Sequence, residues 1–153
     1  MNLIREYFKD PYYISTDKSK IDVAEVHQYL SERSYWAKGI PREKVQRAID
    51  NSLTFSIYKD DSQIGYARVI SDFTIFAYLA DVFVLEEYRG KGLSKWLMEV
   101  ITNFPELQGL RRWMLLTKDA HSLYSKYGFK PMSNPEMAME ISNPNLFLTN
   151  KEK

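Results

Sequence analysis

The sequence predicts a mixed α/β domain in which helices cover a sheet. The chain has 153 residues, of which 44% are hydrophobic, and this size suits one domain with a single sizeable core. Segments with the two-residue period of strands alternate with segments that have the longer period of helices. Residues 75–85 are nearly all apolar, which is typical of a central strand covered on both faces. We therefore expect one layered domain over residues 1–153.

The N-terminal third is expected to form one strand and two helices. Residues 11–16 read as a short strand, and the apolar residues of 21–33 roughly keep a helical period. Pro41 suits the first position of a second helix, which should end near residue 51. The aromatic stretch 34–40 is the expected loop between the two helices.

The middle of the chain is expected to supply a hairpin, the central strand and the strongest helix. Residues 53–58 and 63–70 alternate around a polar turn, which predicts the hairpin. After the central strand, apolar residues recur at helical spacing over 93–104 and predict an amphipathic helix.

The C-terminal part should return to the sheet. We expect a strand over 111–117 and a short helix that is capped by Asp119 and ends at Gly128. The chain should rejoin the sheet from Phe129, with Met137 to Ile141 as a last alternating strand. A loose tail is expected from about residue 143.

Composition excludes several classes of function. The formal net charge is only +1, which argues against nucleic acid or an acidic membrane as a partner. The chain has no cysteine, and His27 and His121 are its only histidines, so we expect no metal site and no thiol nucleophile. The charged N-terminus does not resemble a signal peptide, and no apolar run approaches a membrane span, so a cytoplasmic protein is expected.

A glycine-rich basic turn lies between the central strand and the amphipathic helix. Its sequence from 88 to 96 is Tyr-Arg-Gly-Lys-Gly-Leu-Ser-Lys-Trp. A strand-to-helix turn directs backbone N–H groups and the positive end of the helix dipole at one spot, which suits a phosphate. Gly90 and Gly92 allow close approach and positive φ, while Arg89, Lys91 and Lys95 add charge. The alternative is an ordinary turn with solvated basic residues.

Two common phosphate loops do not match this turn. A Walker loop requires a Gly-Lys-Ser/Thr ending that is absent here, and a dinucleotide loop requires a third glycine where Lys95 stands. What remains is Arg-x-x-Gly-x-Ser at 89–94, after an apolar strand and at the start of a helix.

These residues resemble the GNAT superfamily of acyl-CoA-dependent N-acetyltransferases. The stretch Asp-Val-Phe-Val-Leu-Glu-Glu-Tyr-Arg-Gly-Lys-Gly-Leu-Ser, 81–94, is similar to the pyrophosphate-binding segment of that family, with Ser94 at a position where the family has glycine or alanine. The block Ala-His-Ser-Leu-Tyr-Ser-Lys-Tyr-Gly-Phe, 120–129, resembles its late helix. The likeness covers roughly 53–141. It implies a mostly antiparallel twisted sheet of about six to seven strands with about four helices, splayed between the fourth and fifth strands.

The resemblance implies that acetyl-CoA is the co-substrate and that it binds in this splay. The residues expected to hold it are Phe83, Val84, Leu85, Arg89, Gly90, Lys91, Gly92, Leu93, Ser94, Thr117 and Tyr124. The backbone N–H of Val84 would stabilise the charge that develops on the acetyl oxygen. Direct attack by the amine fits the lack of cysteine, although a serine relay stays open.

Tyr124 stands where the family has a catalytic tyrosine, and it is the expected acid for the leaving thiolate. Against a thiol pKa of about 8.5, a tyrosine of pKa about 10 makes full proton transfer uphill by roughly 2 kcal/mol, so hydrogen-bond donation is the safer role. The alternative is a core residue, because Tyr124 belongs to an apolar helical stripe. Tyr127 is the fallback acid.

Asp81 is the one charge in the central strand. A lone carboxylate there is costly unless it is hydrogen-bonded or used, so it could remove the proton of the amine. The alternatives are a pair with Arg68 or another cation, or a wet side of the sheet. Asp72, Glu99 and His121 are weaker candidates for proton removal, and a water chain could replace a dedicated base.

The acceptor pocket is expected from the first helices, their loop and the central strand. Its predicted residues are Tyr35, Trp36, Phe73, Tyr78 and Asp81. Aromatic rings beside a carboxylate suit a cationic amine. Packing beneath a loop is the alternative for Tyr35 and Trp36.

Together these features predict an N-acetyltransferase for a primary amine of a small molecule, an amino acid or a peptide. The alternative is a sensor that binds acyl-CoA without transfer. Acetylation of charged tRNA is disfavoured by the net charge, although Arg111 and Arg112 form a local basic patch. A homodimer is possible, because the expected strand Met137 to Ile141 offers an edge.

Overall fold

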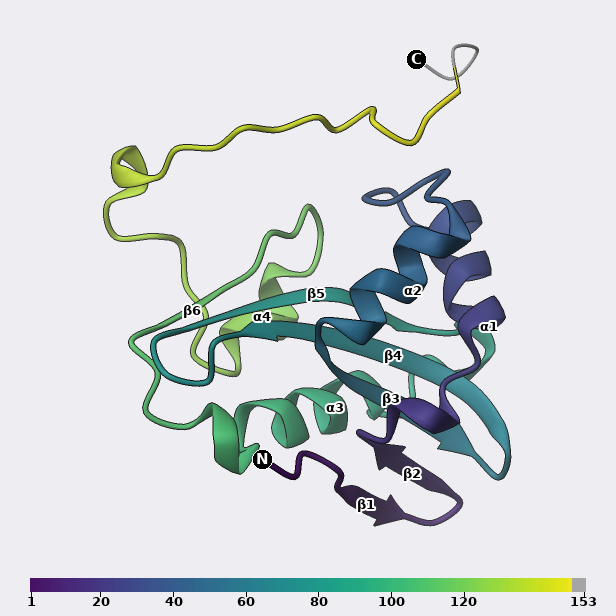
Figure 1. The fold of residues 1–153 in the computed structure, drawn as a ribbon. Helices are drawn as coiled ribbons and strands as arrows, with labels where there is room; N and C mark the ends of the chain where they lie inside the picture. Colours follow the sequence, from purple (N-terminus) through teal and green to yellow (C-terminus); the bar gives the residue numbers. More distant parts are fainter. Residues whose placement is uncertain (150–153) are drawn as a thin grey trace.

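The computed structural model describes residues 1–149 and shows one six-stranded sheet with helices on both faces (Figure 1). The strands follow the order β1-β2-β3-β4-β5-β6. Their bounds are β1 Glu6–Lys9, β2 Tyr12–Ser15, β3 Leu53–Lys59, β4 Ser62–Ser71, β5 Phe76–Val84 and β6 Arg112–Met114. The helices are α1 Val23–Gln28, α2 Arg42–Asp50, α3 Leu93–Thr102 and α4 His121–Ser125. The mixed α/β class and the predicted numbers of strands and helices are confirmed.

The sheet begins with a hairpin where the sequence predicted one strand. The expected strand 11–16 is β2, and β1 pairs with it on the outer side in an antiparallel register. The charges of β1 hid this strand from the hydrophobic pattern. Such charges are tolerated at a sheet edge, because an edge strand faces solvent and is protected by them from pairing with other chains.

The first two helices match their predicted places with small shifts. The Asp22 side chain caps α1 by accepting the N–H of Glu25 at 3.2 Å, and a π-helical turn, Tyr29–Arg33, continues the helix. Pro41 precedes α2 as its cap and is not its first residue. The Tyr29 ring stacks on Phe83 of β5 with centroids 3.9 Å apart, which fixes this helical pair against the central strand.

The core lies between the central strands and the helices on either side. The predicted hairpin is formed by β3 and β4, and β4 pairs with β5 along most of its length. α3 packs its apolar face against the sheet, as its spacing predicted. The largest fully buried side chains include Phe55, Tyr66, Leu97, Ile101 and Phe104.

β5 and β6 run parallel and separate after a short contact. Their pairing is limited to Phe76–Tyr78 with Arg112–Met114. The predicted strand 111–117 therefore forms over three residues only. Beyond Tyr78, β5 continues without β6 beside it, so the expected splay is confirmed between these two strands, which are fourth and fifth when the unpredicted β1 is left out.

The predicted return of the chain to the sheet is wrong. Residues 129–149 form no strand, and Met137 to Ile141 pair with no other segment of residues 1–149. After a 3-10 turn at Pro135–Met137, the chain runs as an extended tail that stands off the body (Figure 1). The alternation of 137–141 is real, but a strand needs a partner edge, and this segment has none within its own described chain.

Candidate active site

A β-bulge in β5 places Asp81 at the start of the splay. Tyr66 pairs with Phe83 and Arg68 with Ala80, so Asp81 and Val82 stand opposite the single residue Ala67. Asp81 has φ of 55°, a left-handed conformation that aspartate adopts more readily than most residues. A bulge bends its strand and redirects the side chains. This one lies on the part of β5 beyond Tyr78, where the pairing with β6 has ended.

The backbone amide of Val84 faces the splay. The N–H of Leu85 donates to the carbonyl of Ile64 at 2.9 Å, which directs Leu85 toward β4. Because successive residues of a strand direct their backbone groups to opposite edges, Val84 faces the side of β6. The Val84 carbonyl agrees with this, since it accepts the Nε–H of Arg89 at 2.9 Å. The Val84 N–H thus points into the opening, where pairing with β6 has ended.

The glycine turn forms the start of α3 with the geometry that its sequence predicted. Gly90 and Gly92 both have φ of +78°, and a Cβ at either would meet nothing within 4 Å. The conformation therefore demands glycine, and the space around the turn stays open. No side chain caps the first N–H groups of α3, and Lys91 and Lys95 are exposed. Uncapped amides and two lysines together suit an anion.

Arg89 makes two hydrogen bonds within the protein. Its guanidinium donates to the Val84 carbonyl and, at 2.9 Å, to the hydroxyl of Tyr29. These bonds fasten the turn to the end of β5 and to the first helical pair. The side chain remains half exposed.

Tyr124 is buried on α4, with its ring at 68° to the Phe129 ring. Burial raises the pKa of its phenol to about 12. Its hydroxyl makes no hydrogen bond within residues 1–149, so its proton is free for a ligand. Tyr127 differs, because its hydroxyl donates to the carbonyl of Lys95 at 2.9 Å.

The carboxylate of Asp81 is held by two donors. Arg68 Nε donates to one oxygen and the Trp36 indole N–H to the other, both at 2.8 Å. Arg68 also reaches the Ser52 hydroxyl at 3.2 Å. The predicted alternative of an Arg68 pair is thus present. A cationic group that approaches Asp81 must share it with Arg68.

Tyr35 links the loop after α1 to the segment after β6. Its hydroxyl accepts the N–H of Lys118 at 2.8 Å, and its ring meets Trp36 edge-on. Thr117 holds the start of α4, because its hydroxyl accepts the N–H of Ala120 at 3.0 Å. No side chain caps α4 itself, so the cap that was expected from Asp119 is absent.

One pocket of about 830 Å³ lies between β5, the loop after α1 and the segment after β6, and neither Val84 nor residues 89–94 are among its lining residues. Of the predicted residues, the pocket brings together Tyr35, Trp36, Tyr78, Asp81, Thr117 and Tyr124. Phe73 is not among its lining residues. It lies in the turn between β4 and β5, with φ of 60° and its N–H bonded to the Ser71 hydroxyl.

The C-terminal tail contributes a rim that the sequence did not predict. Pro144 and Phe147 line the pocket, and the Lys44 ammonium of α2 lies 5.0 Å from the centre of the Phe147 ring. The carbonyl of Phe147 occupies the place that a Cβ on Gly39 would take. The apolar run Leu-Phe-Leu at 146–148, within an otherwise polar tail, was the available signal for this contact.

The weaker proton acceptors lie elsewhere. Asp72 accepts three backbone N–H groups of its own turn, and these bonds lower its pKa. Glu99 and His121 are exposed. Within residues 1–149, no three His, Asp or Glu side chains gather as a metal site would require, and no helix has the length and apolar character to cross a membrane.

Comparison with known sequences identifies the family. Residues 50–131 match the model of the acetyltransferase (GNAT) domain. A protein of Gibberella zeae that is named as an acetyltransferase is 30% identical over 144 residues, and the match covers 80% of each chain. An N-acetyltransferase of Prochlorococcus marinus, named as uncharacterised, is 30% identical over 108 residues, which are 67% of this chain and 59% of that protein.

Solved structures agree with the sequences. A GNAT-family protein of Xanthomonas campestris is 51% identical with a TM-score of 0.89, over 90% of this chain and 97% of that one. An acetyltransferase of Clostridium acetobutylicum, solved with acetyl-CoA, has a TM-score of 0.64 at 14% identity, over 90% of this chain and 96% of that one, and this shows likeness of fold alone. The matched domain covers more than half of the chain and contains the splay and the glycine turn. The chain therefore belongs to the GNAT acetyltransferase family.

Proposed function

We propose that this protein transfers the acetyl group of acetyl-CoA directly to a primary amine of a small molecule, an amino acid or a peptide. The observation that carries the proposal is the opening between β5 and β6. It has the free amide of Val84 on one side and the buried, protonated phenol of Tyr124 on the other. Acyl transfer from a thioester needs a donor for the oxygen and a donor for the leaving sulfur.

The glycine turn has the properties that a pyrophosphate requires. Open space surrounds Gly90 and Gly92, the first amides of α3 carry no side-chain cap, and Lys91 and Lys95 supply charge. We assign the pyrophosphate of acetyl-CoA to this turn. Arg89 acts as the tie that holds the turn at the end of β5.

Val84 and Tyr124 stabilise negative charge on two different atoms of the thioester. The Val84 N–H donates to the acetyl oxygen as the amine nitrogen bonds to the carbonyl carbon and the carbon–sulfur bond breaks. With a phenol pKa of about 12, full transfer of its proton to a thiolate of pKa about 8.5 is uphill by roughly 5 kcal/mol. Tyr124 therefore stabilises the sulfur by hydrogen bonding, and the proton that the sulfur finally gains balances the one that the amine loses to water.

Asp81 is the group that we assign to the amine. Each of its oxygens accepts one hydrogen bond, which leaves lone pairs for a further donor. The rings of Tyr35, Trp36 and Tyr78 enclose the approach, and such walls favour an amine over an anion.

A sensor that binds acetyl-CoA without transfer is the second candidate. The observation that favours it is the engagement of Asp81 by both Arg68 and Trp36, since this could exclude an amine. The two functions share the glycine turn and differ in turnover.

Calorimetric titration with acetyl-CoA tests the shared part. We expect micromolar binding by the native chain and a loss of at least about 100-fold in Gly92→Glu, because the new carboxylate repels the pyrophosphate. Gly109→Glu is the matched control, since Gly109 also has positive φ, at 72°, and open space, but lies in another turn. Failure of the folded native chain to bind would refute both functions.

Release of free thiol during incubation with a panel of amines then separates enzyme from sensor. The chain has no cysteine, so the protein adds no thiol background. Thiol release with at least one amine supports transfer. Binding with no release across amino acids, polyamines and peptide N-termini would favour the sensor.

A further inference from the structure

Two hydrogen-bond donors on β4 line the acceptor pocket and present atoms that have no protein partner. Tyr66 is 1% exposed and lines the pocket, yet its hydroxyl makes no hydrogen bond within residues 1–149. Arg68 lines the pocket as well. It uses Nε for Asp81 and Nη1 for Ser52, while its Nη2 makes no bond in the described part of the chain. Buried polar groups almost always have a partner, so two free donors in one pocket indicate a ligand.

The two donors lie close to Asp81 on one face of the sheet. Tyr66 and Arg68 stand at alternate positions of β4, so their side chains share a face. The Tyr66 ring packs against Phe83 of β5, with ring centroids 5.8 Å apart. Burial raises the pKa of the Tyr66 phenol, the charge of Asp81 raises it further, and Arg68 lowers it. The phenol therefore keeps its proton and is a donor beside both charges.

A simple amine would leave the charges of this pocket unbalanced. The side chains of Arg68 and Asp81 are 17% and 12% exposed, and they form an ion pair with each other. An ammonium group that binds Asp81 draws it from Arg68, and a buried cation that loses its partner is costly. An acceptor with its own carboxylate removes this cost, because the carboxylate pairs with Arg68 while the ammonium group pairs with Asp81. Its two oxygens also match the two free donors.

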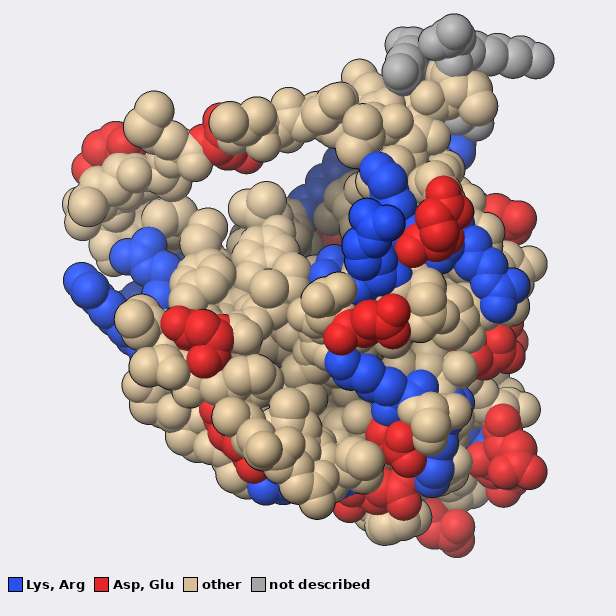
Figure 2. All heavy atoms as spheres, in the orientation of Figure 1, with Lys and Arg blue, Asp and Glu red and all other residues tan. Residues whose placement is uncertain are grey.

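The side of the pocket formed by α2 is positive. The stretch 38–47 covers the loop before α2 and most of the helix, and its exposed charged residues are Lys38, Arg42, Glu43, Lys44 and Arg47. Figure 2 shows lysine and arginine side chains gathered over α2, beside the hollow beneath the C-terminal tail. Such a field attracts an acceptor that carries an anionic group and opposes a bare cation.

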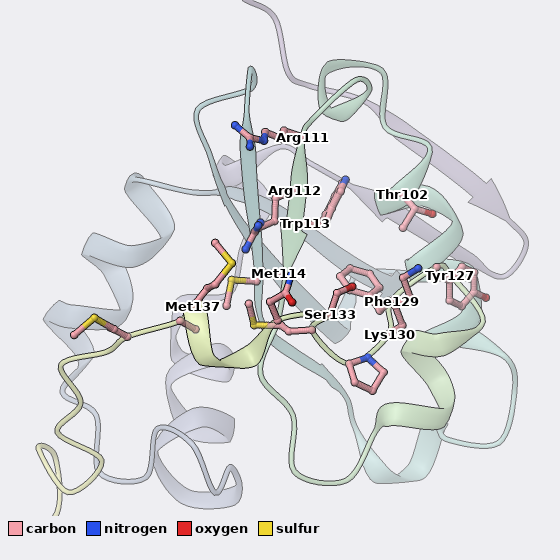
Figure 3. Close-up of a pocket in the computed structure, with 16 residues that line it drawn as sticks. Thr102, Arg111, Arg112, Trp113, Met114, Tyr127, Phe129, Lys130, Ser133 and Met137 are labelled. Carbon is pink, nitrogen blue, oxygen red and sulfur yellow. The ribbon is translucent and has the colours of Figure 1, made fainter.

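A second cavity of similar size lacks this combination of charges. It lies beside β6 and encloses about 840 Å³, and Figure 3 shows Arg111, Arg112 and Lys130 around it. No carboxylate is among the described residues that line it, so it offers no partner for an ammonium group. The acceptor pocket provides both a carboxylate and a guanidinium.

Apolar residues line the acceptor pocket where α2, the loop before it and the tail meet. They are Ala37, Ile40, Val45, Ala48, Pro144 and Phe147. Such a surface suits an aliphatic or aromatic side chain.

We propose that the acceptor is a free α-amino acid with an apolar side chain. Its ammonium group binds Asp81, its carboxylate accepts hydrogen bonds from Arg68 Nη2 and the Tyr66 hydroxyl, and its side chain packs against the apolar residues of α2 and the tail. Tyr66 thereby determines specificity, because it selects a carboxylate beside the amine. The inference rests on the proposed function for its reaction, but binding of the amino acid is measurable without transfer.

Calorimetric titration with leucine, in the absence and in the presence of coenzyme A, tests this recognition. Leucine should bind with a dissociation constant below about 1 mM. Isopentylamine, which is leucine without its carboxylate, should bind at least about tenfold more weakly, because it forms no bond to Arg68 or Tyr66. Leucinamide, which resembles a peptide N-terminus, should be weakened by a similar factor. Equal binding of either compound would overturn the proposal, as would no binding of leucine, methionine or phenylalanine.

Tyr66→Phe tests the assigned contact. It should lower the affinity for leucine by about five- to tenfold and leave that for isopentylamine within about twofold. The variant should resist urea like the native chain, because the lost hydroxyl has no protein partner. Tyr58→Phe is the matched control, since Tyr58 is a buried tyrosine of β3 whose hydroxyl is also unpaired within residues 1–149 but which does not line the pocket. Equal losses for the two ligands, or no loss for leucine, would contradict the assignment.

Thiol release from acetyl-CoA separates this inference from the proposed function. Leucine and isopentylamine are compared at equal concentrations of their neutral amine forms, which removes the difference in their amine pKa values. Faster release with leucine supports both proposals. Equal or faster release with isopentylamine supports transfer and overturns the amino acid as acceptor. Selective binding of leucine with no release supports the amino-acid site and refutes transfer.

Discussion

β5 and β6 form the two sides of the same opening, but they are held in different ways. β5 pairs with β4 along its length, carries the bulge at Asp81 and ends at the glycine turn that Arg89 fastens. β6 has three residues and one neighbour, and the side that carries Tyr124 is held by α4, by Phe129 and by contacts of single side chains. The difference teaches that the side assigned to acetyl-CoA is built into the core, whereas the side proposed to donate to the sulfur depends on local packing.

Arg68→Met should have the largest effect and should act on the β5 side. The substitution leaves the Asp81 carboxylate, whose side chain is 12% exposed, without its cation. Loss of one partner from such a pair costs roughly 3 kcal/mol in the free energy of unfolding. Urea denaturation measures this value. Arg33→Met removes a more exposed arginine that pairs with Glu86, and should cost less than about 0.5 kcal/mol. Equal effects would mean that the Asp81 pair does not hold the bulge.

Tyr124→Phe should give the next largest effect, on turnover. Removing the hydroxyl takes away the donor to the sulfur but keeps the packed ring, so turnover should fall by at least about tenfold. Affinity for acetyl-CoA should stay within a factor of about three, because the glycine turn is unchanged. Tyr127→Phe is the control in the turn directly after that helix, and it should change turnover less than about twofold. Unchanged turnover in Tyr124→Phe would exclude the proposed role.

The pKa of Tyr124 gives a prediction for stability at high pH. Its folded pKa of about 12 lies above the ordinary tyrosine value of 10.0. The neutral phenol is therefore favoured by folding, and this contribution is complete below about pH 10 and is lost between about pH 10 and pH 12. At about pH 11 the native chain should have lost about 1.4 kcal/mol that Tyr124→Phe does not lose. Other buried tyrosines titrate in both proteins, so only the difference between the two unfolding curves is informative. Parallel curves would show that Tyr124 is solvated.

The β5 side could be predicted from the sequence because its signals are local. An unbroken apolar run predicts a covered strand, and the positive φ at Gly90 and Gly92 follows from the need for glycine in a tight turn. Asp81 is a charged residue in that apolar run. In the structure it lies at a bulge, and its carboxylate accepts a hydrogen bond from Arg68. The family resemblance added the ligand that such a turn would hold.

The other side could not be predicted because its contacts are distant in the sequence. The Lys118 N–H donates to the Tyr35 hydroxyl across 83 positions, and the Tyr127 hydroxyl donates to the Lys95 carbonyl across 32. No spacing rule connects such pairs. The alternation of 137–141 predicted a strand that does not form, because the period of a strand contains no information about its partner.

The smallest predicted effect concerns the tail that crosses the acceptor pocket. Phe147 lines the pocket and packs beneath Lys44, whereas its neighbour Leu146 is 51% exposed and does not line the pocket. With the amine that gives the fastest turnover, Phe147→Ser should raise KM for the amine by about two- to fivefold, which is the loss of part of one apolar contact. Leu146→Ser should leave KM unchanged, and both variants should bind acetyl-CoA like the native chain. The tail lies against the pocket through the Phe147 ring. A two- to fivefold rise in KM for the amine would therefore mean that part of the recognition of the acceptor comes from the tail and not from the sheet. If both variants behave like the native chain, the pocket is completed by the loop at 34–40 and by β5 alone.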